Sequence, residues 1–335
     1  MSRPRRLPRD FSRNAGYPLY AIDPVRDRGW VLHFEPGDYR RASFLDQRAL
    51  HHREISGWEL SRAEVEEALE PASAPPPRWL FHIGHCGSTL VSRLLDLVPG
   101  VLGLREPLPL LTLATGREDA RCGPWFPIVS QLLARGFVDT TATLVKPTSL
   151  VTTLADRLLP GSGPACLLWV DLHTWLASML REDALKDTVL ANEPLRLHGV
   201  RALPDAAGDA ERLARAWLAE QVRWLDLPRN VTNAALCDLD FADVLADPAG
   251  STARLASHFG LAAPQDLERR IAESGLLHRY AKDDSQAFDA DTRNRELAAA
   301  ALRHADAVAD GLRWAEAALC AEGLQHLLPR LRPKG

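Results

Sequence analysis

Residues 79–90, with the sequence WLFHIGHCGSTL, combine the residue types that bind an anion. An apolar run ends at Gly84, a second glycine stands at Gly87, and two hydroxyl residues, Ser88 and Thr89, follow directly. Glycines let the backbone turn tightly, and the helix expected from Ser88 onward presents unpaired N–H groups and a positive dipole end to an anion. This strand, turn and helix predict an anion-binding loop. The alternative is the same turn without a ligand.

The loop lacks the lysine on which ATP-dependent phosphotransferases rely. Their Walker A loop reads GxxxxGK[ST], and its lysine contacts the β- and γ-phosphates. Here Ser88 follows Gly87, which disfavours a P-loop kinase or NTPase. His85 is the basic side chain inside the loop, and a bound dianion would favour its charged form; the alternative is a surface histidine after a turn. Cys86 is expected to be a small, unreactive packing residue.

Two further residues with reactive groups follow expected strands. Lys146 ends the apolar run 141–147, TATLVKP, and open α/β sheets bind their ligands at the carboxyl ends of such strands. Glu106 follows a strand expected after Val98, which should run parallel to the strand that ends at Gly84. Glu106 is therefore expected on the same edge, either as a general base or as an acid that stabilises a helix start.

In order and spacing, these segments resemble the sulfotransferases that use PAPS (3′-phosphoadenosine 5′-phosphosulfate). The family's loop reads approximately P-[RK]-S-G-T-T-L, and residues 84–90, GHCGSTL, are similar, with glycine in place of proline and His85 in place of the basic residue. Residues 145–147, VKP, resemble the strand end that places a lysine at the transferring group. Glu106 lies twenty-one residues after His85, which matches the acidic base of the tyrosylprotein sulfotransferase branch.

The resemblance continues to the nucleotide-binding part of the family. Residues 239–248, LDFADVLADP, resemble the family's YEDLLADP segment, and residues 278–282, HRYAK, resemble the segment that closes over the nucleotide. The family's 3′-phosphate site has an arginine eight residues before a serine. Ser178 matches the serine, but Val170 stands at the arginine position and Asp171 follows it. The resemblance thus leaves the 3′-phosphate to Arg181, Arg279 or Lys282.

The resemblance implies transfer of a sulfuryl group from PAPS to a hydroxyl or amine on a small-molecule or peptide acceptor, without a metal. The implied catalytic residues are Glu106, Lys146 and His85. The implied residues that bind PAPS are Gly84, His85, Cys86, Gly87, Ser88, Thr89, Ser178, Arg279 and Lys282. The alternatives are a P-loop kinase or NTPase and a non-catalytic relative that binds a nucleotide or a protein.

The remaining pattern predicts the sheet that must position these residues. Apolar or β-branched runs at 79–84, 141–147, 165–171 and 235–242 are each followed by a helical pattern. Strands that alternate with helices indicate a central parallel sheet with helices on both faces. We therefore expect a three-layer α/β/α fold of the P-loop NTPase-like class.

A proline-rich break at 71–78, PASAPPPR, separates a smaller N-terminal region. Residues 18–35 resemble a β-hairpin, and 61–70, SRAEVEEALE, begin with the serine and glutamate of a capping box. The sequence predicts an accessory layer over residues 1–75 and the sulfotransferase-like domain over 76–335.

Composition excludes several other classes. The chain has 335 residues and a net charge of −4, which disfavours a nucleic-acid-binding protein. Its five cysteines form no CxxC pair, and no partner cluster lies near the HxxH of His82 and His85, so a metal site is not expected. No apolar stretch is long enough to span a membrane, and no secretory leader is evident, so a cytoplasmic protein is expected. The acceptor and the oligomeric state are not predicted.

Overall fold

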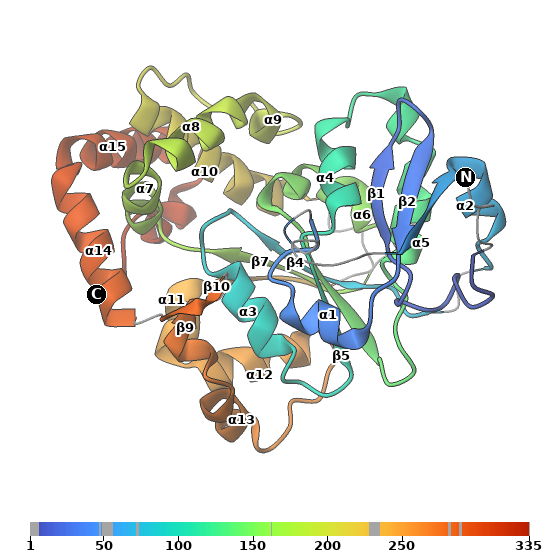
Figure 1. The fold of residues 1–335 in the computed structure, drawn as a ribbon. Coiled ribbons are helices and arrows are strands. Elements are labelled where there is room, and N and C mark those ends of the chain that lie inside the picture. Colours follow the sequence, from blue (N-terminus) through green and yellow to red (C-terminus); the bar gives the residue numbers. More distant parts are fainter. Residues whose placement is uncertain are drawn as a thin grey trace.

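The computed structural model describes residues 7–46, 48, 56–71, 74–161, 163–227, 235–280, 283–287 and 290–334. Within these ranges, a five-stranded parallel sheet has the order β5-β6-β4-β7-β8 (Figure 1). Its strands are β4 (Arg78–His82), β5 (Val101–Arg105), β6 (Ala142–Lys146), β7 (Ala165–Trp169) and β8 (Leu236–Asp240). Because the strands are parallel, all five carboxyl ends lie on one edge.

The first strand of the sheet, β4, lies at its centre. The chain adds β5 and β6 on one side of β4 and then crosses over to add β7 and β8 on the other. In sheets of this kind, ligands bind at the carboxyl edge where the strand order reverses. The residues that follow β4, β5 and β6 are those that the sequence singled out.

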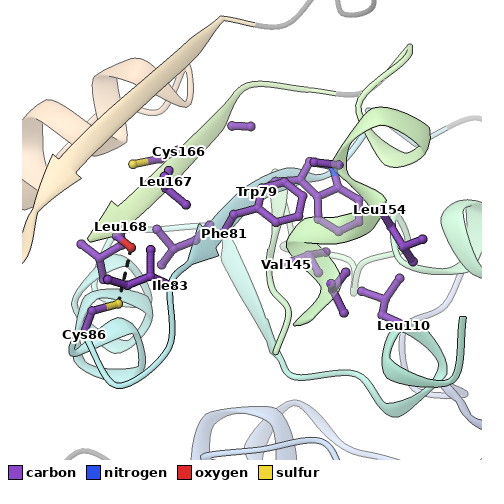
Figure 2. Close-up of a cluster of buried hydrophobic side chains, with 14 of the residues drawn as sticks. Trp79, Phe81, Ile83, Cys86, Leu110, Val145, Leu154, Cys166, Leu167 and Leu168 are labelled. Carbon is purple, nitrogen blue, oxygen red and sulfur yellow. Dashed lines mark hydrogen bonds between the residues drawn. The ribbon is translucent and has the colours of Figure 1, made fainter. Parts of the chain in front are cut away.

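Burial explains why these runs become central strands. Every residue of β6 and of β7 is buried, as expected for parallel strands covered on both faces. Figure 2 shows part of this core, in which Trp79 and Phe81 of β4 stack with ring centroids 5.5 Å apart. The sheet is thus a rigid platform for the loops at its edge.

Helices cover both faces of the sheet, which gives the expected three-layer α/β/α architecture (Figure 1). One face carries α3 (Ser88–Leu95), α11 (Phe241–Ala246), α12 (Pro248–His258) and α13 (Leu267–Ser274). The other carries α7 (Leu172–Leu180), α8 (Asp183–Ala191), α9 (Glu193–Leu197), α10 (Asp209–Asp226) and α15 (Ala305–Ala321). Further helices are α4 (Leu108–Thr115), α5 (Trp125–Leu132), α6 (Ala155–Leu158) and α14 (Ala290–Arg303).

The N-terminal region forms an antiparallel sheet of its own. The hairpin of β1 (Leu19–Asp23) and β2 (Arg28–Leu32) is joined by β3 (Gly57–Ser61), a strand that the sequence did not indicate. Two short helices, α1 (Pro36–Arg41) and α2 (Arg62–Glu67), accompany it, and Ser61 makes the expected capping box with Glu64. The division at residues 75 and 76 stays a prediction.

A second antiparallel ribbon pairs β9 (Arg279–Tyr280) with β10 (Asp283–Ala287).

None of the helices in the described ranges has both the length and the apolar character needed to cross a membrane.

Candidate functional site at the carboxyl edge of the sheet

The loop after β4 is built from left-handed backbone. Gly84, His85 and Gly87 have φ values of 88°, 52° and 78°. Consecutive residues of this kind form concave turns whose N–H groups bind anions. Among the described residues, only three other than glycine have positive φ, and two of them are His85 and Glu106. Such strain gathers at functional sites, so the backbone itself marks both residues.

Gly87 allows the loop to touch the helix that follows β8. It precedes the first residue of α3, and a Cβ built there would lie 2.1 Å from Cε2 of Phe241, at the start of α11. Only a residue without a side chain permits this approach. The packing of Phe241 therefore depends on glycine at this position.

Gly87→Ala is expected to lower the free energy of unfolding by about 2–4 kcal/mol, because a clash adds to the cost of left-handed backbone. Gly323→Ala is the matched control, since Gly323 has φ 70° but nothing within 4 Å of its Cβ position. Its cost should be about 1 kcal/mol. Chemical denaturation measures both, and equal losses would contradict the packing of Phe241 on the loop.

The loop side chains divide between the core and the solvent. Cys86 is fully buried, and its thiol donates a 3.4 Å hydrogen bond to the carbonyl of Leu168 (Figure 2). Burial raises the pKa of Cys86 to about 12, so the thiol is unreactive and only the backbone of this residue can face an anion. His85 is exposed. Ser88 and Thr89 are buried, and within the described structure the Thr89 hydroxyl has no hydrogen-bond partner.

Glu106 and Lys146 are brought together at the ends of β5 and β6. The ammonium of Lys146, 1% exposed, donates a hydrogen bond to Oε1 of Glu106, which is 17% exposed. The Glu106 backbone also donates to the Lys146 carbonyl at 2.6 Å. Helix α4 is capped by Pro107 and has no acid in its first turn, so Glu106 does not act as a helix-start acid. Two of the three predicted catalytic residues therefore form one partly buried ion pair.

His82 links the anion loop to the segment after Lys146 through two hydrogen bonds. The Gly84 N–H donates to Nδ1 of His82 at 3.1 Å, so the proton of the neutral ring sits on Nε2 and is donated to the Pro147 carbonyl at 2.8 Å. The ring is 4% exposed. His82 is thus a structural bridge between the turn after β4 and the residue that follows Lys146.

The N-terminal region contributes two residues that sequence reasoning missed. The Arg48 guanidinium lies 3.7 Å from Oε2 of Glu106 and stacks 3.5 Å over the ring of Phe44. The same ring lies 5.6 Å from the Lys146 ammonium. No motif in the sequence marks either residue.

Hydrogen bonds hold the N-terminal segment that precedes Phe44 and Arg48 in place. Arg105, fully buried at the end of β5, donates to the carbonyls of Tyr39 at 2.8 Å and Ala42 at 3.1 Å. Arg93 of α3 donates to the Ser43 hydroxyl at 2.9 Å. The accessory layer is therefore anchored directly beside the Glu106–Lys146 pair.

Arg196 of α9 is a third missed residue, behind the anion loop. It is 5% exposed, pairs with the fully buried Glu220 at 2.6 Å, and donates to the Ser149 hydroxyl at 2.8 Å. A Cβ at Gly84 would lie 3.1 Å from that hydroxyl and 3.9 Å from the guanidinium. A buried cation thus stands next to the turn, although one arginine among 40 basic residues carries no sequence signal.

The residues expected at the 3′-phosphate are not assembled into a described site. Ser178 is half-buried on α7, and Arg181 at the end of that helix pairs with Glu182 at 3.3 Å and Glu296 at 3.1 Å. Asp171, beside the missing arginine, caps α7 by accepting the Thr174 N–H at 2.9 Å, and burial raises its pKa. The Arg279 side chain and the whole of Lys282 lie outside the described residues.

In the ranges that are described, no group of three or more His, Cys, Asp or Glu side chains is placed to hold a metal ion.

Comparison with known proteins finds sulfotransferases among solved structures. The sulfotransferase domain of an olefin synthase from Synechococcus is 13% identical, over 70% of this chain and 97% of that domain, with a TM-score of 0.38. A sulfotransferase from Mycobacterium avium is 13% identical over 72% and 79%, with a TM-score of 0.38. Retinol dehydratase in complex with retinol and PAP is 12% identical over 85% and 96%, with a TM-score of 0.27. No protein-family model and no curated protein sequence matches the chain.

The chain is thus similar to sulfotransferases. At this identity and these TM-scores, the likeness assigns no residue role and no substrate. The roles below rest on the loop, the ion pair and their neighbours.

Proposed function

We propose that this protein transfers a sulfuryl group from PAPS to a hydroxyl or amine of a small-molecule or peptide acceptor. The observation that carries the proposal is the partly buried Glu106–Lys146 pair beside an anion loop that has no Walker A lysine. At this edge the Glu106 carboxylate can accept a proton, and the Lys146 ammonium can neutralise negative charge. An ATP-dependent phosphotransferase would need the lysine in the loop instead.

The anion loop is the part that holds the 5′-phosphosulfate in this proposal. Its left-handed backbone and the start of α3 offer N–H donors, and the unpartnered Thr89 hydroxyl fits an oxygen of the anion. His85 lies exposed at the loop, where a bound dianion would favour its charged form. Arg196, which is paired with Glu220, donates to the Ser149 hydroxyl behind the turn. Ser178, Arg279 and Lys282 are the residues proposed for the 3′-phosphate.

The chemistry needs little from the protein beyond position and charge. The acceptor oxygen or nitrogen bonds to sulfur, and the bond between sulfur and the 5′-phosphate oxygen breaks. Glu106 takes the acceptor proton, and Lys146 stabilises the negative charge on the leaving oxygen. Their ion pair holds both groups oriented before the donor binds.

Calorimetric titration of PAP, AMP, ADP and ATP tests the nucleotide part of this proposal. PAP is expected to bind more tightly than AMP by about 1.5–3 kcal/mol, the contribution of charge-assisted hydrogen bonds to the 3′-phosphate. Lys282→Ala should reduce that preference. Equal affinity for PAP and AMP would overturn PAPS as the donor, and a preference for ATP would favour a kinase or NTPase.

The affinity for PAP is expected to fall as pH rises between about 6 and 8 if His85 faces the phosphate. A bound dianion raises the pKa of the imidazole above its value in the free loop. The stabilisation is then fully present below the free-state pKa and is lost as pH passes the bound-state pKa. Calorimetry at a series of pH values measures this dependence.

His85→Asn is the matched variant, because asparagine tolerates left-handed backbone and carries no titratable group. It should flatten the pH dependence that remains after the ligand's own phosphate titration is subtracted. His85→Arg should keep tight binding at high pH. Identical profiles for the wild type and His85→Asn would show that His85 does not contact the anion.

A further inference from the structure

Two cysteines outside the proposed site lie side by side in the central sheet. Cys166 of β7 and Cys237 of β8 are register partners in a parallel ladder, so their side chains are on the same face. Neighbouring strands are about 4.8 Å apart, and a disulfide accepts Cα separations of about 4.4–6.8 Å. Cys166 also appears in Figure 2.

The two thiols differ in access. Cys166 is fully buried, whereas Cys237 is partly exposed on β8, which ends the strand order of the sheet. A small reagent from solvent therefore meets Cys237 first. Cys166, at 0% exposure, is closed to the reagent.

His258, the last residue of α12, completes the cluster. Its Nε2 lies 3.1 Å from the carbonyl of Ala165, the residue that directly precedes Cys166. Cys237, which contributes most, and this carbonyl raise the pKa of His258. Hydrogen bonds from Cys166 and then His258 lower the pKa of Cys237 to about 6, against the effects of burial and of the neighbouring Asp238. Burial raises the pKa of Cys166.

The arrangement combines a thiol that can act as a nucleophile, Cys237, with a second thiol that can form a disulfide with it, Cys166. A thiolate is the nucleophilic form of cysteine, and Cys166 and then His258 favour it at Cys237 by lowering the pKa of that thiol. A second thiol within reach lets an oxidised sulfur form a disulfide. Cys86 and Cys122 are buried and have raised pKa values, so they lack these properties.

We propose that Cys237 is a peroxide-reactive cysteine and that Cys166 is its resolving partner. The Cys237 thiolate attacks one oxygen of a hydroperoxide, the O–O bond breaks, and the departing alkoxide or hydroxide takes a proton from His258. Cys237 is then a sulfenic acid. The Cys166 sulfur attacks the Cys237 sulfur, and hydroxide leaves with the Cys166 proton as water. Two thiols and one hydroperoxide thus give one disulfide, one alcohol or water, and one further water.

The first test uses the unmodified full chain treated with one equivalent of hydrogen peroxide at neutral pH. Titration should show that two of the five thiols are lost. Peptide mapping without reduction should recover Cys166 linked to Cys237, and a dithiol reductant should restore both thiols. Oxidation that falls first on the exposed Cys320, or that joins two copies of the chain, would overturn the proposal.

Variants separate the two steps. Cys166→Ser should stop at the sulfenic acid, which dimedone traps on Cys237. Cys320→Ser is the matched control and should form the Cys166–Cys237 disulfide at the wild-type rate. His258→Gln should slow peroxide consumption by about tenfold or more at neutral pH, because the thiolate fraction falls. An unchanged rate in a folded His258→Gln protein, or no dimedone adduct on Cys237, would contradict the assigned roles.

Discussion

Glu106→Gln is expected to lower sulfuryl transfer per folded molecule by about 10²–10⁴-fold, the usual contribution of a general base. Glutamine keeps the size and the hydrogen-bonding reach of Glu106 but cannot take the acceptor proton. Its contact with Lys146 survives as a weaker hydrogen bond from the ammonium to an uncharged amide oxygen. Affinity for PAP should therefore change little, which calorimetry measures alongside the transfer rate.

The same substitution also removes the counter-charge of a lysine that is 1% exposed. Loss of one member of a buried ion pair costs about 3–5 kcal/mol, so the variant should be less stable. Glu106→Gln combined with Lys146→Met should recover much of this stability without recovering transfer. A Glu106→Gln protein that is folded, binds PAP and transfers at the wild-type rate would show that the base lies elsewhere.

Lys146→Met is expected to lower transfer by about 10²–10³-fold, the typical effect of removing one group that stabilises developing negative charge. Methionine keeps the apolar stem that β6 buries. Glu106 retains Arg48 at 3.7 Å and partial access to water, so the loss of stability should be smaller than for Glu106→Gln. Rates at saturating donor, with denaturation curves, measure both effects.

Lys186→Met is the control for Lys146→Met. Lys186 lies on α8, and within the described part of the chain its ion pairs are with Asp183 at 3.0 Å, Asp187 at 3.9 Å and Asp209 at 4.0 Å. Its replacement should leave transfer unchanged. Full transfer by a folded Lys146→Met protein would remove Lys146 from the proposed machinery.

The central strands could be predicted from the sequence because their apolar residues match a position that is buried on both faces of the sheet. β4, β6 and β7 are short apolar runs, and a strand covered on both faces requires such a run. β3 is different, since GWELS has no β-branched residue and only one of its five positions is buried. Its pairing with β2 decides its conformation, and that partner lies 25 or more residues earlier in the chain.

The residues of the candidate site also fall into those that the sequence could predict and those that it could not. Glu106 and Lys146 were found because parallel strands put their ends on one edge, which is a rule of topology that sequence can apply. Phe44, Arg48 and Arg196 were not found, because buried hydrogen bonds between distant segments place them there. No local pattern records those contacts.

Transfer of a labelled sulfuryl group from PAPS, measured against a panel of phenols, sugars, amines and peptides, tests the central proposal most directly. The account predicts a labelled product and stoichiometric PAP with the wild type, and neither with Glu106→Gln at the same nucleotide occupancy. A parallel reaction with γ-labelled ATP should give no product. Label transferred from ATP, or none transferred from PAPS by a wild type that binds PAP, would contradict it.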